Sequence, residues 1–232
     1  MAWVRYILYF FGVACITCML TQLAISFPGS LKLHVMVNES DQFGTSEFSP
    51  VEIIQPFILL ICGLLMAWVA KYCPTQRPIA FPFGGLALAF IIRELDYFFD
   101  RFIVDNLWQA LVAIALALVI TYTYRQRKRL KIAWGRIWPS PGIALLFAGA
   151  VIMFAFISLV GHEPLWMSIM GDGYQRIVKL AVEEFIELGA YFLWLIGSIE
   201  YALQARAIAY RAPQPAAQRL RKKRRHDAEG EY

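Results

Sequence analysis

Long apolar stretches separated by short charged segments dominate this 232-residue chain. Each stretch is close to the roughly 20 residues that a helix needs to cross the hydrocarbon core of a bilayer. We predict six membrane-spanning helices, at residues 6–26, 51–70, 79–99, 107–124, 142–160 and 178–203. The sequence therefore predicts an all-α integral membrane protein with a single six-helix domain over residues 1–203. Residues 204–232 form a basic tail that we expect to be disordered.

The first apolar stretch has an alternative interpretation as a cleaved signal peptide. Ala24 and Ser26 resemble the small residues of a signal-peptidase site. The stretch at 6–26 is longer than the apolar region of an ordinary signal peptide, so we expect it to be retained as a span.

The distribution of Lys and Arg predicts how the helices are oriented. With six spans, both termini lie on one side of the membrane, and that side collects 17 of the 22 basic residues. Basic residues concentrate on the cytoplasmic side of membrane proteins, so both termini are predicted to be cytoplasmic. We expect the protein in the plasma membrane, which is the inner membrane in a Gram-negative bacterium.

The composition supports a membrane protein and argues against a nucleic-acid-binding one. Hydrophobic residues make up 59% of the chain, against about 45–50% in soluble domains. The net charge is +5, but the basic residues flank apolar spans. The predicted partner is therefore the lipid bilayer, with anionic lipids attracted to residues 125–136 and 219–225, and no nucleic acid. Apolar residues at helical spacing within 125–141 also predict a short amphipathic helix on the membrane surface.

Acidic residues show the opposite bias, because 13 of the 17 lie on the predicted outer side or in the outer part of a span. The last span begins with Glu183, Glu184 and Glu187, which fall within one 100° arc of a helix at 100° per residue. The same arc continues with Tyr191, Trp194, Ser198 and Tyr201. An ionised carboxylate at this depth is costly against lipid, so this stripe should face the protein interior.

Two further spans bring polar residues to the same outer edge. Arg93 lies well inside the outer half of its span, and we expect it to pair with Glu187 or Glu184. The predicted charge cluster consists of Glu52, Gln55, Arg93, Glu94, Asp96, Glu183, Glu184 and Glu187. Favourable electrostatics at helix ends are an alternative explanation for the acids nearest the membrane edge.

So many carboxylates around one arginine need either protons or a bound cation. Carboxylate oxygens suit hard divalent cations such as Mg²⁺, Ca²⁺ or Mn²⁺, and Glu94, Glu184 and Glu187 are the candidate ligands. The three histidines of the chain do not supply a pair for a haem within the spans. His162, in a predicted outer loop, is a candidate participant.

Three functions remain open. The first is transport or ion coupling through a cation- or proton-binding site near the outer face. The second is an intramembrane enzyme that acts on a lipid-linked substrate at the outer leaflet, with the acids as general acid and base. The third is a non-catalytic membrane subunit or assembly factor. Convergence of Glu94, Glu184 and Glu187 would favour the first two, and a cavity confined to the outer leaflet would favour the enzyme.

Overall fold

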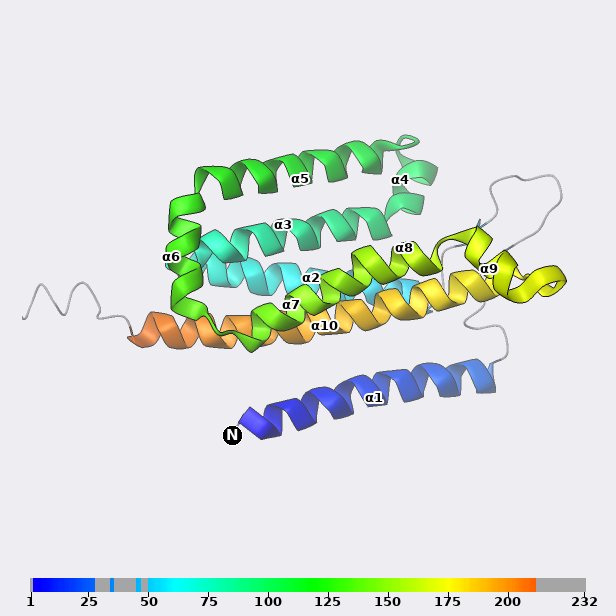
Figure 1. Cartoon of the computed structure of the whole chain (residues 1–232), viewed down its shortest axis with the longest axis horizontal. Helices are drawn as coiled ribbons and strands as arrows, with labels where there is room; N and C mark the ends of the chain where they lie inside the picture. Colours follow the sequence, from blue (N-terminus) through cyan, green and yellow to red (C-terminus); the bar gives the residue numbers. More distant parts are fainter. Residues whose placement is uncertain (1, 28–33, 36–44, 47–49, 212–232) are drawn as a thin grey trace, which may run out of the picture.

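The computed structural model describes residues 2–27, 34–35, 45–46 and 50–211. Most of the described chain is helical, and most helices run along one axis (Figure 1). The helices are α1 (Ala2–Ser26), α2 (Pro50–Tyr72), α3 (Arg77–Glu94), α4 (Asp96–Phe102), α5 (Leu107–Arg125), α6 (Arg127–Ile137), α7 (Pro141–Val151), α8 (Ile157–Val160), α9 (Glu163–Met170) and α10 (Arg176–Arg211).

Four short elements complete the described chain. A π-helical segment, η1 (Ile152–Phe156), joins α7 to α8, and a 3₁₀ turn, η2 (Gly171–Gly173), follows α9. Two-residue strands, β1 (His34–Val35) and β2 (Thr45–Ser46), pair antiparallel between α1 and α2.

Several helices are long and apolar enough to cross a membrane, which is compatible with the predicted integral membrane protein. By length and composition, the described chain has four such helices: α1, α2, α5 and the continuous segment Pro141–Val160. The pair α3 and α4, bent by 52°, adds a fifth if it counts as one span. The long helix α10 is not among them, and it carries four glutamates along the predicted sixth span.

The helices occur at the predicted spans, with two differences. The span predicted at 79–99 is broken at Leu95, where the carboxylate of Asp96 accepts a hydrogen bond of 2.6 Å from the Tyr97 amide. Such local bonds from aspartate compete with the helical ladder and favour a new helix start. The tail prediction is wrong at its beginning, because α10 continues through residues 204–211, where Ala205 packs in the core. Residues 212–232, which include the predicted lipid-binding segment 219–225, lie outside the described residues.

The amphipathic helix predicted within 125–141 is present as α6, which lies across one end of the bundle and buries Ala133 and Ile137 (Figure 1). The first residues of α1 and the last residues of α10 lie at this same end, which we call the α6 end. The opposite end, which we call the α9 end, contains α4 and α9 (Figure 1).

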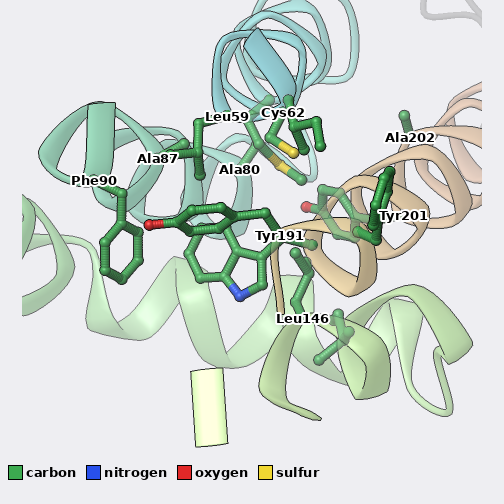
Figure 2. Packing of buried hydrophobic residues seen from close by; sticks show 14 of the residues in the cluster. Leu59, Cys62, Ala80, Ala87, Phe90, Leu146, Tyr191, Tyr201 and Ala202 are labelled. Carbon is green, nitrogen blue, oxygen red and sulfur yellow. The ribbon is translucent and has the colours of Figure 1, made fainter. Parts of the chain in front are cut away.

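Helices α2, α3, α7 and α10 form the packed core. Figure 2 shows Leu59 of α2, Phe90 of α3 and Leu146 of α7 around Tyr191 and Tyr201 of α10. Glycines bring α7 close to α10: a β-carbon at Gly142 would overlap the backbone of Tyr201, and one at Gly149 would overlap the ring of Trp194. Small residues at such crossings let helix backbones approach within a membrane.

Helix α1 stands apart from this core. Leu20 is the only buried side chain among those described in α1. An apolar groove of about 540 Å³ separates much of α1 from α10. The attachment of α1 to the body therefore depends on a few specific contacts.

Candidate functional site

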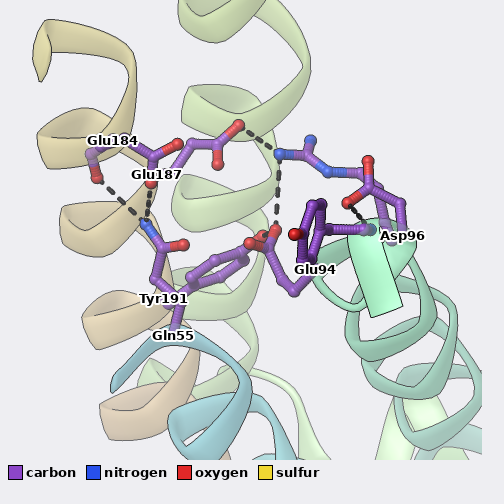
Figure 3. A network of polar contacts seen from close by, with 8 residues as sticks. Gln55, Glu94, Asp96, Glu184, Glu187 and Tyr191 are labelled. Carbon is purple, nitrogen blue, oxygen red and sulfur yellow. Dashed lines mark hydrogen bonds and ion pairs between the residues drawn. The ribbon is translucent and has the colours of Figure 1, made fainter. Parts of the chain in front are cut away.

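The α9 end of the core contains an ion pair between α3 and α10. Nη2 of Arg93 lies 2.5 Å from Oε1 of Glu187 and 3.4 Å from Oε1 of Glu94 (Figure 3). Glu187 is only 4% exposed. The predicted pairing of Arg93 with a carboxylate of the last span is confirmed.

Tyr191 fixes the second carboxylate. It lies one turn beyond Glu187 on α10, is fully buried, and donates a hydrogen bond of 2.5 Å to Oε1 of Glu94. Oε1 of Glu94 therefore has the Tyr191 hydroxyl and the Arg93 guanidinium as neighbours (Figure 3). The sequence assigned Tyr191 to the polar stripe but did not predict this hydrogen bond.

Gln55 brings α2 to the third carboxylate. Its Nε2 donates to Oε2 of Glu184 at 2.9 Å and to the backbone oxygen of Glu184 at 3.2 Å. The Gln55 side chain is fully buried; its Nε2 is hydrogen-bonded to Glu184, while its Oε1 has no hydrogen-bond partner among the described residues. Gln55 therefore joins α2 to α10 at the level of the ion pair.

These six residues form what we call the carboxylate cluster: Gln55, Arg93, Glu94, Glu184, Glu187 and Tyr191 (Figure 3). Glu94 of α3 and Glu187 of α10 meet at the guanidinium of Arg93, while Glu184 of α10 is held by Gln55. With every carboxylate ionised, the cluster would carry a net charge of −2. Burial in surroundings of low dielectric makes this excess charge costly unless a proton or another cation compensates it.

The other predicted members lie at the same end of the bundle. Glu52 is half-buried, one turn before Gln55 on α2. Glu183 pairs with Lys179 at 3.3 Å on its own helix. Asp96 bonds to the backbone at the start of α4, and His162 is exposed in the turn before α9. Asp96, Glu183 and His162 thus lie outside the hydrogen-bonded cluster.

The predicted metal ligands Glu94, Glu184 and Glu187 do not form a recognisable cation site. Within the described part of the chain, no group of three or more His, Cys, Asp or Glu side chains could hold a metal ion. The guanidinium of Arg93 contacts both Glu94 and Glu187, while Gln55 donates to Glu184. The structure gives no support to a Mg²⁺, Ca²⁺ or Mn²⁺ site here.

A second polar site, which the sequence interpretation missed, joins α1 to α10 near the α6 end. Arg5 donates from Nε and Nη2 to the two carboxylate oxygens of Glu200, at 2.9 and 3.0 Å. Tyr9 donates to Oε1 of Glu200 at 2.8 Å. We call these three residues the Glu200 site. Arg5 precedes the first apolar stretch and Glu200 lies at the inner end of the last one, so their opposite charges were the available signal.

Aromatic side chains of α10 fill the core from the carboxylate cluster to the level of Glu200. Tyr191, Trp194 and Tyr201 are almost wholly buried, and the rings of Phe90 and Trp194 meet edge to face at 5.3 Å. The hydroxyl of Tyr201 donates to the backbone oxygen of Gln76 at 3.1 Å. The predicted stripe on α10 therefore packs tightly against its neighbouring helices.

A pocket of about 340 Å³ lies beside the carboxylate cluster, between α3, α5 and the η1–α8 segment. Its lining is mostly apolar and includes Trp108 and Phe154, with Arg93 on its wall. The side chain of Arg93 is 36% exposed although its partner Glu187 is buried. The cluster thus has one accessible cationic edge, at the α9 end.

Comparison with known proteins gives no relative from which a role for these residues could be transferred. No known protein family, curated protein or solved structure matches this chain.

Proposed function

We propose that this chain is a multi-pass membrane protein whose carboxylate cluster binds a proton near the outer membrane face and serves transport or ion coupling. The observation that carries the proposal is the excess of acid over base: Arg93 contacts both Glu94 and Glu187, and Glu184, which is held by Gln55, adds a third carboxylate without an arginine of its own. A proton is the smallest cation that can reduce the excess negative charge without displacing Arg93. Of the two alternatives predicted from the sequence, a proton or a metal ion, we therefore propose the proton.

We further propose that α10 is the sixth span, that both termini are cytoplasmic, and that the α6 end faces the cytoplasm of the cell. Seventeen of the 22 basic residues then lie on the cytoplasmic side. The neighbouring positions of the start of α1 and the end of α10 support this orientation (Figure 1). The membrane is the plasma membrane, or the inner membrane of a Gram-negative cell.

Proton occupancy and the position of Arg93 are coupled in this proposal. Loss of the proton leaves two uncompensated negative charges next to Arg93, so release favours a deeper position of the guanidinium or the entry of another cation. Uptake weakens the attraction between Arg93 and the glutamates. A movement of Arg93 between its two carboxylates and the neighbouring pocket is the conformational step that the cluster would drive.

Infrared difference spectroscopy of the purified full chain tests proton binding. We expect a protonated-carboxyl band at neutral pH that decreases on alkalinisation and is lost or reduced in Glu184→Gln and Glu187→Gln. Glu200→Gln is the matched control, because Glu200 has its own arginine, and it should keep the band. A spectrum without this band, or a band that persists in both cluster variants, would refute the proposal.

Metal analysis of the same preparations separates a proton site from a cation site. We expect equal metal content in the wild type, Glu187→Gln and Arg93→Ala. Stoichiometric metal in the wild type that falls in both variants would instead establish a cation site.

The pocket beside Arg93 favours a second candidate, an intramembrane enzyme that acts on a lipid-linked substrate. An apolar chain would occupy the pocket while its polar group reaches Arg93, and the glutamates would act as general acid and base. Filling the pocket with Ala89→Phe distinguishes the two functions. Proton binding should survive this change, whereas turnover of a lipid-linked substrate should be lost.

A further inference from the structure

A further cavity, of about 470 Å³, lies at the α6 end, and its lining contains no residue of the carboxylate cluster or of the Glu200 site. It is formed where the end of α2 meets the extension of α10 that was not predicted from the sequence. The lining residues are Trp68, Tyr72, Cys73, Arg206, Ala209 and Tyr210.

The charge of this cavity is positive. The guanidinium of Arg206 lies 5.5 Å from the centre of the Tyr210 ring, and Lys71 lies 5.2 Å from the centre of the Tyr72 ring. Among the described residues, no acidic side chain lines the cavity. An anion there would meet Arg206, with Lys71 near the ring of the lining residue Tyr72, and no carboxylate of this lining would repel it.

The aromatic residues indicate a ligand that also has an apolar part. Trp68 is 37% exposed and Tyr72 is more exposed still, so both rings are partly accessible on the outer surface of the bundle. Trp and Tyr are enriched where membrane headgroups begin, because their rings are apolar and their N–H or O–H groups are polar. Segment 219–225 beyond α10 is rich in Lys and Arg, so that segment has the wrong charge to occupy this cavity.

We infer that this cavity, which we call the Arg206 pocket, binds the phosphate headgroup of an anionic phospholipid from the leaflet at the α6 end. Arg206 donates to the phosphate oxygens, and Lys71 adds charge at the rim. The acyl chains lie along Trp68 and the adjacent surface of α2. The inference is independent of the carboxylate cluster, which lies at the other end of α10.

Quenching of Trp68 fluorescence tests this site. The full chain is reconstituted in phosphatidylcholine vesicles that contain a minor fraction of phosphatidylglycerol, with bromine on the acyl chains of one lipid or the other. The Trp68 signal is the difference between the wild type and Trp68→Phe. We expect brominated phosphatidylglycerol to quench Trp68 more strongly than an equal fraction of brominated phosphatidylcholine.

Two variants, each lacking a different exposed arginine, test the role of Arg206. Arg206→Ala should lower the preference for phosphatidylglycerol about fivefold, the effect of one basic residue near an anionic surface. Arg101→Ala, an exposed arginine of α4 at the opposite end of the bundle, should leave the preference unchanged. Equal quenching by both lipids, or equal losses in the two variants, would overturn the inference. Relief of quenching by inorganic phosphate would assign the pocket to a soluble anion and overturn the lipid assignment.

Discussion

Helix α10 carries two glutamate sites built from the same kinds of side chain but with different charge ratios. At the Glu200 site, one carboxylate receives two hydrogen bonds from Arg5 and one from Tyr9. In the carboxylate cluster, Glu94 and Glu187 share Arg93, and Glu184 has only the amide of Gln55, so three carboxylates are present for one arginine. The number of acids for each arginine therefore separates a structural ion pair from a site with unbalanced charge.

The difference shows how to recognise a candidate functional site within a membrane. A buried glutamate and its own arginine together carry no net charge, so this pair has no need of a further cation. A buried group of acids that outnumbers its arginine must gain a proton, gain a cation or move. Glu200 therefore attaches α1 to α10, and the carboxylate cluster is the candidate functional site.

Removal of Arg93 should have the largest effect on stability. Arg93→Ala leaves Glu187 buried without its cation, which should destabilise the protein by about 3 kcal/mol, at the low end for broken buried pairs because Arg93 is partly exposed. Thermal unfolding of the purified protein measures this loss. Glu187→Gln added to Arg93→Ala should recover most of it.

Arg101→Ala, an exposed arginine on α4, is the control for that experiment. It should unfold at the temperature of the wild type. Equal melting temperatures for Arg93→Ala and Arg101→Ala would mean that the cluster does not depend on its arginine.

Loss of the Tyr191 hydroxyl should have the next smaller effect. Tyr191→Phe removes the hydrogen bond to buried Glu94 and should cost about 1.5 kcal/mol, because a buried acceptor loses its donor. Tyr9→Phe removes the corresponding bond at the Glu200 site, where Arg5 still supplies two hydrogen bonds. The thermal shift should therefore be larger for Tyr191→Phe, and the reverse order would contradict the proposed difference between the sites.

Gln55→Met should have a smaller effect again. The change keeps the volume of the side chain but removes the donor to Glu184, at a cost of about 1 kcal/mol. Gln109→Met is the control, because Gln109 makes an exposed hydrogen bond to Asn106 on α5. Thermal unfolding should detect the first change and not the second.

The smallest effect concerns a titratable group at the α6 end. Burial raises the pKa of the Cys73 thiol, while the nearby Arg206 opposes that increase. Arg206→Ala should therefore raise the pKa of Cys73 further, lower its thiolate fraction at pH 8 and slow its alkylation. Peptide mapping after timed alkylation measures this rate, and faster labelling in the variant would contradict the contact between Arg206 and Cys73.

The sequence pattern predicted the helices and the pairing of Arg93, but it predicted contacts across the core less well. The ion pair of Arg93 and Glu187 could be predicted because the two residues have opposite charges and lie at similar depths in their predicted spans. The hydrogen bond from Tyr191 to Glu94 depends on how α10 is rotated against α3, and a helical periodicity in one segment does not fix that rotation.

The misplaced acids have a common cause. Glu183 lies on the predicted face of α10 but meets Lys179 first, one turn away on the same helix. Asp96 follows Arg93 closely in sequence, yet the 52° bend between α3 and α4 intervenes. Local interactions therefore decided the partners of both acids, whereas the prediction considered only which end of the membrane they approach.

The length of chain between the two glutamate sites sets an electrical property of the molecule. Glu200 lies 13 positions after Glu187 on α10, or about 20 Å along the axis at the rise of an α-helix. The hydrocarbon core of a bilayer is about 30 Å thick. In the proposed orientation, aromatic packing between the two sites forms an insulating layer thinner than the surrounding lipid. When the membrane voltage falls mainly across this layer, the electric field along α10 is therefore stronger than the field in the surrounding bilayer.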